Sequence, residues 1–263
     1  MKKRLQSITS KLPTIIALLI ILLLWFLLSK SGAVPSYMLP SPLDVLTALT
    51  KNFSTILSHA QITLVEGIYG LLIGIAIAFF TATLMDSFSV LNSAIYPIMV
   101  ITQTVPTIAI APILVLWMGF GMAPKITLVI ITTFFPIAVG LLDGYKSVDK
   151  NAVDLMRSMG ASKLQIFFHL KFPSALPNFF SGIKISSSYA IVGAVISEWL
   201  GGFKGLGVYM TRVRKAYAFD KMFAVIIFII IISLLLMALV KLISKVSMPW
   251  LRAEKSNKGD KSL

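Results

Sequence analysis

The chain has 263 residues, of which 57% are hydrophobic and 13% are charged, and its formal net charge is +14. A single soluble domain of this size cannot bury so much apolar surface, so the composition indicates an integral membrane protein. There is no cysteine, and the two histidines, His59 and His169, are far apart in the sequence, which argues against disulfides and metal sites. The basic excess is typical of Lys and Arg facing anionic lipid rather than nucleic acid.

Six apolar runs approach or exceed the length of about 20 residues that a helix needs to cross a bilayer. The loops between them are too short for a second globular domain, so the sequence predicts an all-α protein with six transmembrane helices. The first run follows basic residues, as in a secretory signal, but it is longer than a signal core and no clear cleavage site follows. We therefore expect it to be retained. The runs are residues 12–28, 60–84, 96–118, 123–142, 176–197 and 222–243.

The distribution of Lys and Arg predicts the orientation of the spans. With the N-terminus in the cytoplasm, 15 of the 24 basic residues lie inside, 8 lie outside and Lys184 lies within a span. This bias favours cytoplasmic termini and a cytoplasmic loop at residues 143–175. The basic cluster at residues 212–221 opposes the assignment, because it would lie outside.

The segment between the first two spans, residues 34–58, contains the start signals of a helix. Ser41 is a good N-cap, Pro42 suits the first helical position and Asp44 lies in the first turn. We expect a short amphipathic helix at the outer membrane interface. The alternative is a simple linker.

Small residues in the second span predict a helix-packing face. Gly70, Gly74 and Ala78 recur every four residues, and Glu66 lies one turn earlier on the same stripe. An intramembrane carboxylate on that stripe faces protein rather than lipid. Glu66 is either a pathway residue or a carboxyl bonded to a neighbour near the outer end of the helix.

The third and fifth spans hold candidate path residues. In the third span Pro106 interrupts the helix among three polar side chains, so either a broken helix lines a pathway or an ordinary proline kink is present. In the fifth span Lys184 is expected at the inner interface, and nearby serines either line the path or act as packing contacts. The candidate path residues are Gln103, Thr104, Thr107, Ser187, Ser188 and Glu66.

A glycine-rich segment follows the fifth span, opening on an acid beside an interfacial tryptophan. It is a candidate outer gate or docking surface for a binding protein, with the basic residues after it meeting acids on that partner. The alternative is a structured outer loop. The candidate residues are Glu198, Trp199, Gly201, Gly202, Arg212 and Arg214.

The charged segment 154–177 between the fourth and fifth spans predicts a helical hairpin. We expect a helix over residues 153–159, a left-handed reversal at Gly160, and a second helix over 162–170 that Pro173 ends. The first helix presents apolar side chains beside a basic one, which suits insertion into a partner's groove. These side chains are Leu155, Met156, Arg157 and Met159.

This segment resembles the EAA coupling loop of permease subunits in binding-protein-dependent ABC importers. Gly160 and Pro173 match that pattern, Asp154 keeps its acid and Leu170 occupies the apolar position, while two apolar residues replace the alanines. Three further stretches, LPSPLDVL at 39–46, QTVPTIAIAPILVLWMGFG at 103–121 and EWLGGFKGLGVYM at 198–210, are similar to the branch for nitrate, sulfonates, taurine or thiamine-pyrimidine precursors.

The resemblance implies a type I importer fold in a prokaryotic cell membrane. It further implies a homodimer, two ABC ATPase subunits that hold ATP and Mg, and an extracytoplasmic binding protein, with no cofactor, metal or nucleic acid on this chain. The implied organisation is an N-terminal helix (1–33), an outer loop (34–58), a permease core (59–245) that includes the coupling loop (143–175), and a cytoplasmic tail (246–263).

Two other classes are weighed against a permease. An ion-coupled carrier or channel predicts paired intramembrane acids and no dockable loop. An enzyme lacks support, because the ten acids are spread singly along the chain. The nearest approach to a P-loop has Pro124 in place of the second glycine, so ATP hydrolysis is expected on another polypeptide.

Overall fold

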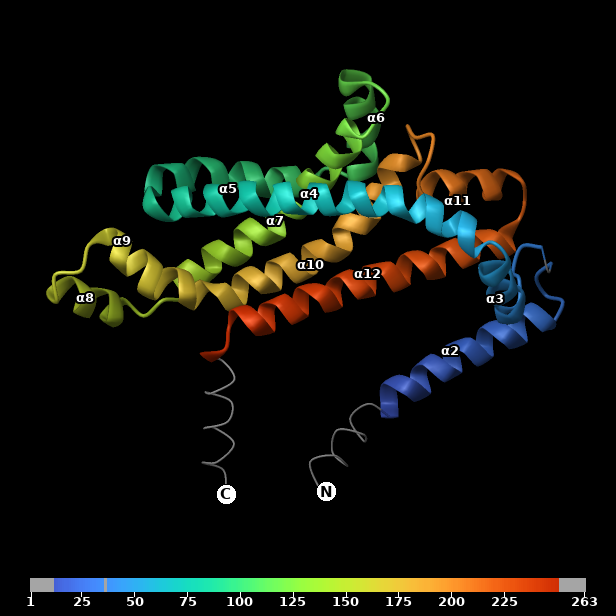
Figure 1. Cartoon of the computed structure of the whole chain (residues 1–263), viewed down its shortest axis with the longest axis horizontal. Coiled ribbons are helices and arrows are strands. Elements are labelled where there is room, and N and C mark those ends of the chain that lie inside the picture. The colour runs from blue at the N-terminus through green and yellow to red at the C-terminus, as the bar shows by residue number, and fades with distance from the viewer. Residues whose placement is uncertain (1–11, 36, 251–263) are drawn as a thin grey trace. The chain divides into compact units, whose positions relative to one another are not determined.

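The computed structural model describes residues 12–35 and 37–250, and within them it contains helices and no strand. The predicted all-α class is confirmed. In chain order (Figure 1) the helices are α2 (Leu12–Lys30), α3 (Pro42–Lys51), α4 (Phe53–Ser87), α5 (Ser89–Thr104), α6 (Thr107–Met118), α7 (Ala123–Lys146), α8 (Lys150–Ser158), α9 (Lys163–Ile166), the π-helix η1 (Phe167–Lys171), α10 (Phe172–Glu198), α11 (Leu206–Lys215) and α12 (Phe219–Ser247).

Five predicted spans appear as single apolar helices long enough to cross a membrane: α2, α4, α7, α10 with the turns before it, and α12. The third predicted span differs. It begins earlier, at Ser89, and consists of α5 and α6, which meet at an angle of 100° across Val105 and Pro106. So sharp a bend is a break and not an ordinary proline kink, because Pro106 lacks the donor that would continue α5. The span count is six when this bent pair is one span.

The described chain divides into two compact units. One contains Tyr209–Ile229 and the described part of Met1–His59, and the other contains Ala60–Val208 and the described part of Ile230–Leu263. Helices α4, α11 and α12 each contribute to both. Of the predicted tail, residues 251–263 lie outside the described residues, as do residues 1–11.

In the first unit, α3 begins as predicted from its cap. The Ser41 hydroxyl accepts the Asp44 N–H at 3.2 Å, and Asp44 Oδ2 accepts the Ser41 N–H at 3.1 Å, which completes a capping box with Pro42 at the start of the helix. Val45 and Ala48 are buried while the polar side chains of Asp44 and Thr47 are exposed, so the helix is amphipathic. The helical alternative to a simple linker is therefore confirmed.

Replacing Ser41 with alanine is expected to loosen α3 locally. Loss of an N-cap costs about 1 kcal/mol, so amides of α3 should exchange about fivefold faster in hydrogen–deuterium exchange. Ser58→Ala is the control, because that exposed hydroxyl bonds only its own helix at Thr55.

The Ser41 hydrogen bonds lower the pKa of Asp44. The stability that the Asp44 carboxylate gives α3 is therefore fully present at pH values above the ordinary pKa of aspartate. It is lost as the pH falls through the lowered pKa of Asp44. Equal exchange in Ser41→Ala and wild type would contradict the cap's role.

The second unit is built around an antiparallel pair, α7 and α10 (Figure 1), whose backbones approach closely at glycines. A Cβ at Gly144 would lie 2.8 Å from Ala175, and one at Gly140 would lie 2.8 Å from the Asn178 carbonyl oxygen. Apolar side chains such as Leu141 and Ala190 fill the core around this contact. Lipid offers helices no hydrophobic reason to associate, so such close contact supplies the packing energy.

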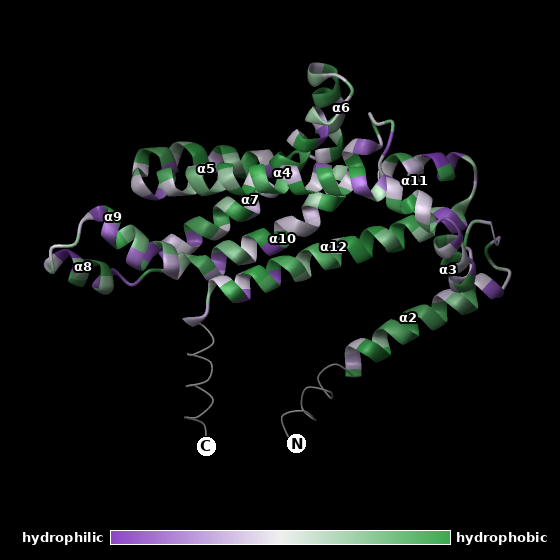
Figure 2. Cartoon of the chain, viewed as in Figure 1, coloured by the Kyte–Doolittle hydropathy of each residue, from purple (hydrophilic) through white to green (hydrophobic). Residues whose placement is uncertain are grey.

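Helix α4 packs on α7 through the small-residue stripe predicted from the sequence. A Cβ at Gly70 would overlap Val129, one at Gly74 would overlap Thr133, and Ala78 is fully buried. Figure 2 shows mostly hydrophobic colour along these helices and hydrophilic colour on the α8–α9 segment, as well as on α3 and α11. That polar segment is the one part of the second unit that projects beyond its spans as a helical hairpin (Figure 1).

The predicted end of the second hairpin helix at Pro173 is wrong. Helix α9 passes into η1 and then into α10 without interruption, with Pro173 in the first turn of α10. In the wider π turn the Phe172 N–H donates to the Phe167 carbonyl, five residues back. This local widening accommodates a proline that an uninterrupted α-helix would exclude.

Candidate functional site

The hairpin of α8 and α9 is fixed by three local signals. The Asp149 side chain caps α8 by accepting the Asn151 N–H at 2.9 Å, and Ser162 forms a capping box with Gln165 at the start of α9. Between them Gly160 takes a φ of +82°, the predicted left-handed reversal. Its N–H donates to the Arg157 carbonyl at 2.9 Å, and this closes the turn.

The tip of the hairpin presents apolar side chains without covering them. Leu155 is 62% exposed and Met159 is 78% exposed, and α8 has no buried residue. Beside them Arg157 pairs with Asp154 at 3.2 Å, a surface ion pair that contributes little to stability. An exposed apolar tip with a charged rim is suited to docking on a partner, because apolar side chains left in water do not stabilise the isolated permease. Met156, Leu170 and Pro173 are half-buried behind this tip.

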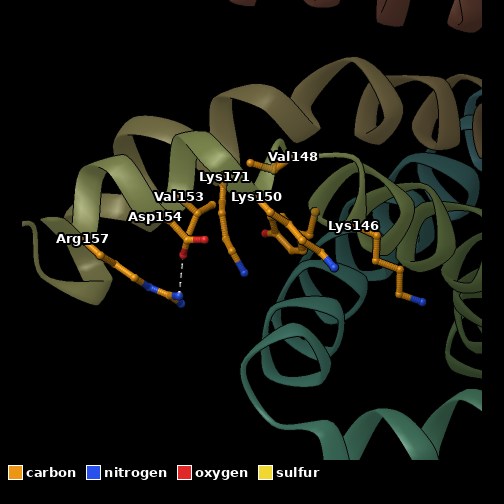
Figure 3. A pocket seen from close by; sticks show the side chains of 8 residues that line it. Lys146, Val148, Lys150, Val153, Asp154, Arg157 and Lys171 are labelled. Carbon is orange, nitrogen blue, oxygen red and sulfur yellow. Dashed lines mark hydrogen bonds and ion pairs between the residues drawn. The ribbon is translucent and has the colours of Figure 1, made fainter.

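A cavity of about 610 Å³ opens between the hairpin and the adjoining ends of α7 and α10. Figure 3 shows Lys150 and Lys171 directed to the same open side of this cavity, with Arg157 turned to Asp154 at its far edge. Four of its eight lining residues are basic and one is acidic: Lys146, Lys150, Arg157, Lys171 and Asp154.

A second group of polar side chains is buried among α4, α7 and α10. Lys125 Nζ donates to Glu66 at 2.7 Å, and both side chains are almost fully buried. Glu198, also buried, accepts the Thr63 hydroxyl at 2.7 Å and lies close enough to Glu66 for their charges to interact. We call Thr63, Glu66, Lys125 and Glu198 the buried charge cluster. It confirms that Glu66 faces protein, and its bond to Lys125 supports the structural interpretation of Glu66.

The buried charge cluster holds the glycine-rich segment in place. Glu198 accepts the Gly207 N–H at 2.6 Å, and Thr63 accepts the Leu206 N–H at 2.9 Å, so both bonds fix the start of α11. Gly205 has a φ of +131° and leaves no room for a Cβ beside the Glu198 carboxylate.

The other candidates in this segment do not join the cluster. Gly201 packs on Val115, Trp199 is 38% exposed, and Arg212 and Arg214 are exposed on α11, a helix that the sequence analysis did not predict. Gly202 does approach Lys125.

A cavity of about 510 Å³ lies between the end of α5 and the α7–α10 pair. Of the predicted path residues it contains Gln103. Thr104 bonds its own helix at Ile101, and Thr107 lies beyond the break in α6. Four polar residues share the cavity with Gln103 and are not among the path residues predicted from the sequence: Asp143, Asn178, Ser181 and Tyr189.

The two predicted path serines of the fifth span, Ser187 and Ser188, do not line this cavity. Ser187 is buried and bonds its own helix at Lys184, while Ser188 contacts Met237 at 2.9 Å. Lys125 and Thr63 were also missed. Lys125 is one of the eight basic residues that the sequence assigns to the outside, yet its side chain is buried because Glu66, 59 residues earlier, supplies a partner.

Residues 70–251 match the family described as binding-protein-dependent transport system inner membrane component. The chain belongs to this family. It is the multi-pass permease subunit of an ABC importer, a transport subunit rather than an enzyme, and ATP hydrolysis belongs to a separate subunit. A carrier or channel is thereby excluded. Within the described residues no group of three or more His, Asp or Glu side chains is placed to hold a metal ion.

Two relatives are similar over most of their length. A probable ABC transporter permease protein of Haemophilus influenzae is 36% identical over 82% of this chain and 89% of its own length. The formylaminopyrimidine transport permease protein ThiX of Halalkalibacterium halodurans is 34% identical over 95% of this chain and 98% of its own.

Two solved structures share the fold. An amino acid ABC transporter chain, solved with histidines, aligns with a TM-score of 0.63 over 76% of this chain and 97% of its own, at 16% identity. The MetNI methionine ABC transporter in an inward-facing conformation aligns with a TM-score of 0.58 over 77% and 97%, at 19% identity. The predicted type I importer fold is confirmed.

Proposed function

We propose that the α8–α9 hairpin is the coupling element through which this permease receives the ATP-driven movement of its ATPase. The observation that carries the proposal is the exposed apolar tip at Leu155 and Met159, held by the left-handed turn at Gly160. Because η1 and α10 continue the hairpin without a break, a displacement of the tip is passed directly into a spanning helix.

The assembly that fits this role is a homodimer with two ATPase subunits that bind ATP and Mg and with one extracytoplasmic binding protein. Both termini and the coupling loop, residues 143–175, lie in the cytoplasm, as the Lys and Arg bias favours. The glycine-rich segment then faces outward as a gate or docking surface, and Arg212 and Arg214 meet acids of the binding protein. The organisation remains helix 1–33, outer loop 34–58, core 59–245 and tail 246–263.

The translocation path is proposed to pass the cavity at the break between α5 and α6. Gln103 lines it, and backbone freed by the break faces protein or water there. Thr104 and Thr107 flank the break, and Ser187, Ser188 and Glu66 are further path candidates from the sequence.

For the solute, we propose a small pyrimidine precursor of thiamine, because similarity to ThiX extends over 98% of that permease. The rival class is a sulfonate such as taurine. In a reconstituted or cellular importer, radiolabelled formylaminopyrimidine should accumulate and unlabelled taurine should not compete. Accumulation of taurine alone would transfer the assignment to the sulfonate class.

The coupling role is tested by co-purifying the ATPase subunit with wild type, Gly160→Pro and Asp154→Lys. Proline cannot reach a φ of +82° and removes the N–H that bonds Arg157, so the turn should be lost. We expect ATPase recovery and uptake to fall at least tenfold, to the order of 10% of wild type, with membrane insertion unchanged. Lys163→Gln, an exposed change in the same loop, is the control. Normal uptake by both variants would refute the proposal.

A further inference from the structure

The cavity beneath the hairpin carries positive charge that the described residues compensate only in part. Arg157 is paired with Asp154, and Lys171 is paired with Asp86 at 2.8 Å. Lys146 lies over the Tyr96 ring at 5.6 Å. Across residues 12–35 and 37–250, no carboxylate lies within ion-pair distance of Lys146 or Lys150. Lys146 and Lys150 therefore line the cavity without an ion-pair partner among the described residues.

The cavity is lined by residues at the ends of two helices that are long and apolar enough to span a membrane. Lys146 is the last residue of α7, and Lys171 directly precedes α10. Basic side chains at such positions meet the headgroup layer of the bilayer. The ring of Phe168, three residues before Lys171, is exposed outside the cavity and provides an apolar surface on the segment that holds Lys171. A ligand with both a phosphate and an apolar portion fits this combination.

We propose that this cavity binds a phosphate group, and that its source is the headgroup of an anionic phospholipid. A volume of about 610 Å³ exceeds what an inorganic phosphate fills and accommodates a glycerophosphate headgroup. The lysines act as point charges on the phosphate oxygens, and the acyl chains remain in the bilayer beside α7 and α10. The inference goes beyond the proposed function, because it requires neither a solute nor an ATPase.

The consequence concerns the hairpin. Lys150 belongs to α8, whereas Lys146 ends α7 and Lys171 adjoins α10. A phosphate shared by these cations ties α8 to the ends of both spanning helices. Bound lipid is therefore expected to hold the coupling hairpin against the membrane surface.

The test measures lipid binding to the purified, delipidated full-length permease by native mass spectrometry. Phosphatidylglycerol and phosphatidylcholine are titrated against wild type and Lys146→Gln/Lys150→Gln. Wild type should prefer phosphatidylglycerol, and the double variant should lose about fivefold in affinity for each lysine. Lys163→Gln/Lys241→Gln, which removes two exposed charges outside the cavity, should retain the preference. Single Lys150→Gln, at an exposed residue, shows the effect without risk to folding.

Further arms separate the phosphate sources. In one outcome, wild type binds inorganic phosphate saturably, the double variant loses that binding, and wild type shows no preference between the two lipids. That result would support a phosphate site but overturn its assignment to a lipid headgroup. Equal phosphatidylglycerol binding by wild type and double variant, or equal loss in the control, would overturn the proposal. The proposal would also be overturned if the double variant lost ATPase recovery while its lipid binding stayed unchanged, because the lysines would then bind acids of the ATPase subunit.

Discussion

Replacing Lys125 with methionine is expected to destabilise the folded permease by about 3–5 kcal/mol. Lys125 is 4% exposed and donates to Glu66 at 2.7 Å, and Glu66 itself is fully buried. Methionine has a similar length but no charge, so the buried Glu66 carboxyl loses its cation, while a second buried carboxyl, Glu198, stays close to it. The midpoint of thermal unfolding, followed by tryptophan fluorescence in detergent, should fall by several degrees.

The control for this prediction is Lys204→Met, which removes an exposed charge from the glycine-rich segment and should leave the midpoint unchanged. The double variant Glu66→Gln/Lys125→Met should recover part of the loss, because it removes the carboxylate that the single variant leaves unpaired. An additive loss in the double variant would show that the pair contributes through packing rather than charge.

The importance of Lys125 extends to the glycine-rich segment. Glu198 uses one oxygen for Thr63 and the other for the Gly207 N–H, while Thr63 also accepts the Leu206 N–H. Disturbing the charges around Glu198 therefore releases the start of α11. We expect faster hydrogen exchange at Leu206 and Gly207 in Lys125→Met, which couples the buried charge cluster to a proposed gate.

Features set by neighbouring residues could be predicted from the sequence. The capping box at Ser41, the reversal at Gly160 and the packing stripe at Gly70 each depend on contacts within one helix or on the size of one side chain. The apolar runs likewise predicted the spans, because the bilayer imposes their length.

Features set by contacts between residues far apart in the sequence could not be predicted from it. The pairing of Glu66 with Lys125 joins residues 59 apart, and the bond from Thr63 to Glu198 joins residues 135 apart. The π turn before Pro173 was also missed, since a proline signals a helix end unless the preceding turn widens. The sequence left open whether Pro106 breaks or only kinks the helix, because the angle of 100° depends on the packing of α5 and α6.

Replacing Gly182 with leucine is expected to separate α7 from α10. A Cβ at Gly182 would lie 2.5 Å from the Pro136 carbonyl oxygen and 3.0 Å from the Ile137 Cα, and backbone atoms cannot move aside as a side chain can. Leucine favours helix over glycine by about 0.8–1 kcal/mol, so α10 itself gains. Overpacking at a backbone contact nevertheless costs about 3 kcal/mol, and the net result should be a lower melting midpoint and poor recovery of folded protein.

The matched control is Gly121→Leu, because a Cβ at Gly121 meets no atom within 4 Å. This variant should fold and insert as the wild type does, although it introduces the same side chain. The α7–α10 pair carries both the cavity at the broken span and the attachment of the coupling hairpin. Gly182→Leu should therefore abolish uptake together with stability, and a stable but inactive Gly182→Leu permease would show that close packing of this pair serves movement rather than folding.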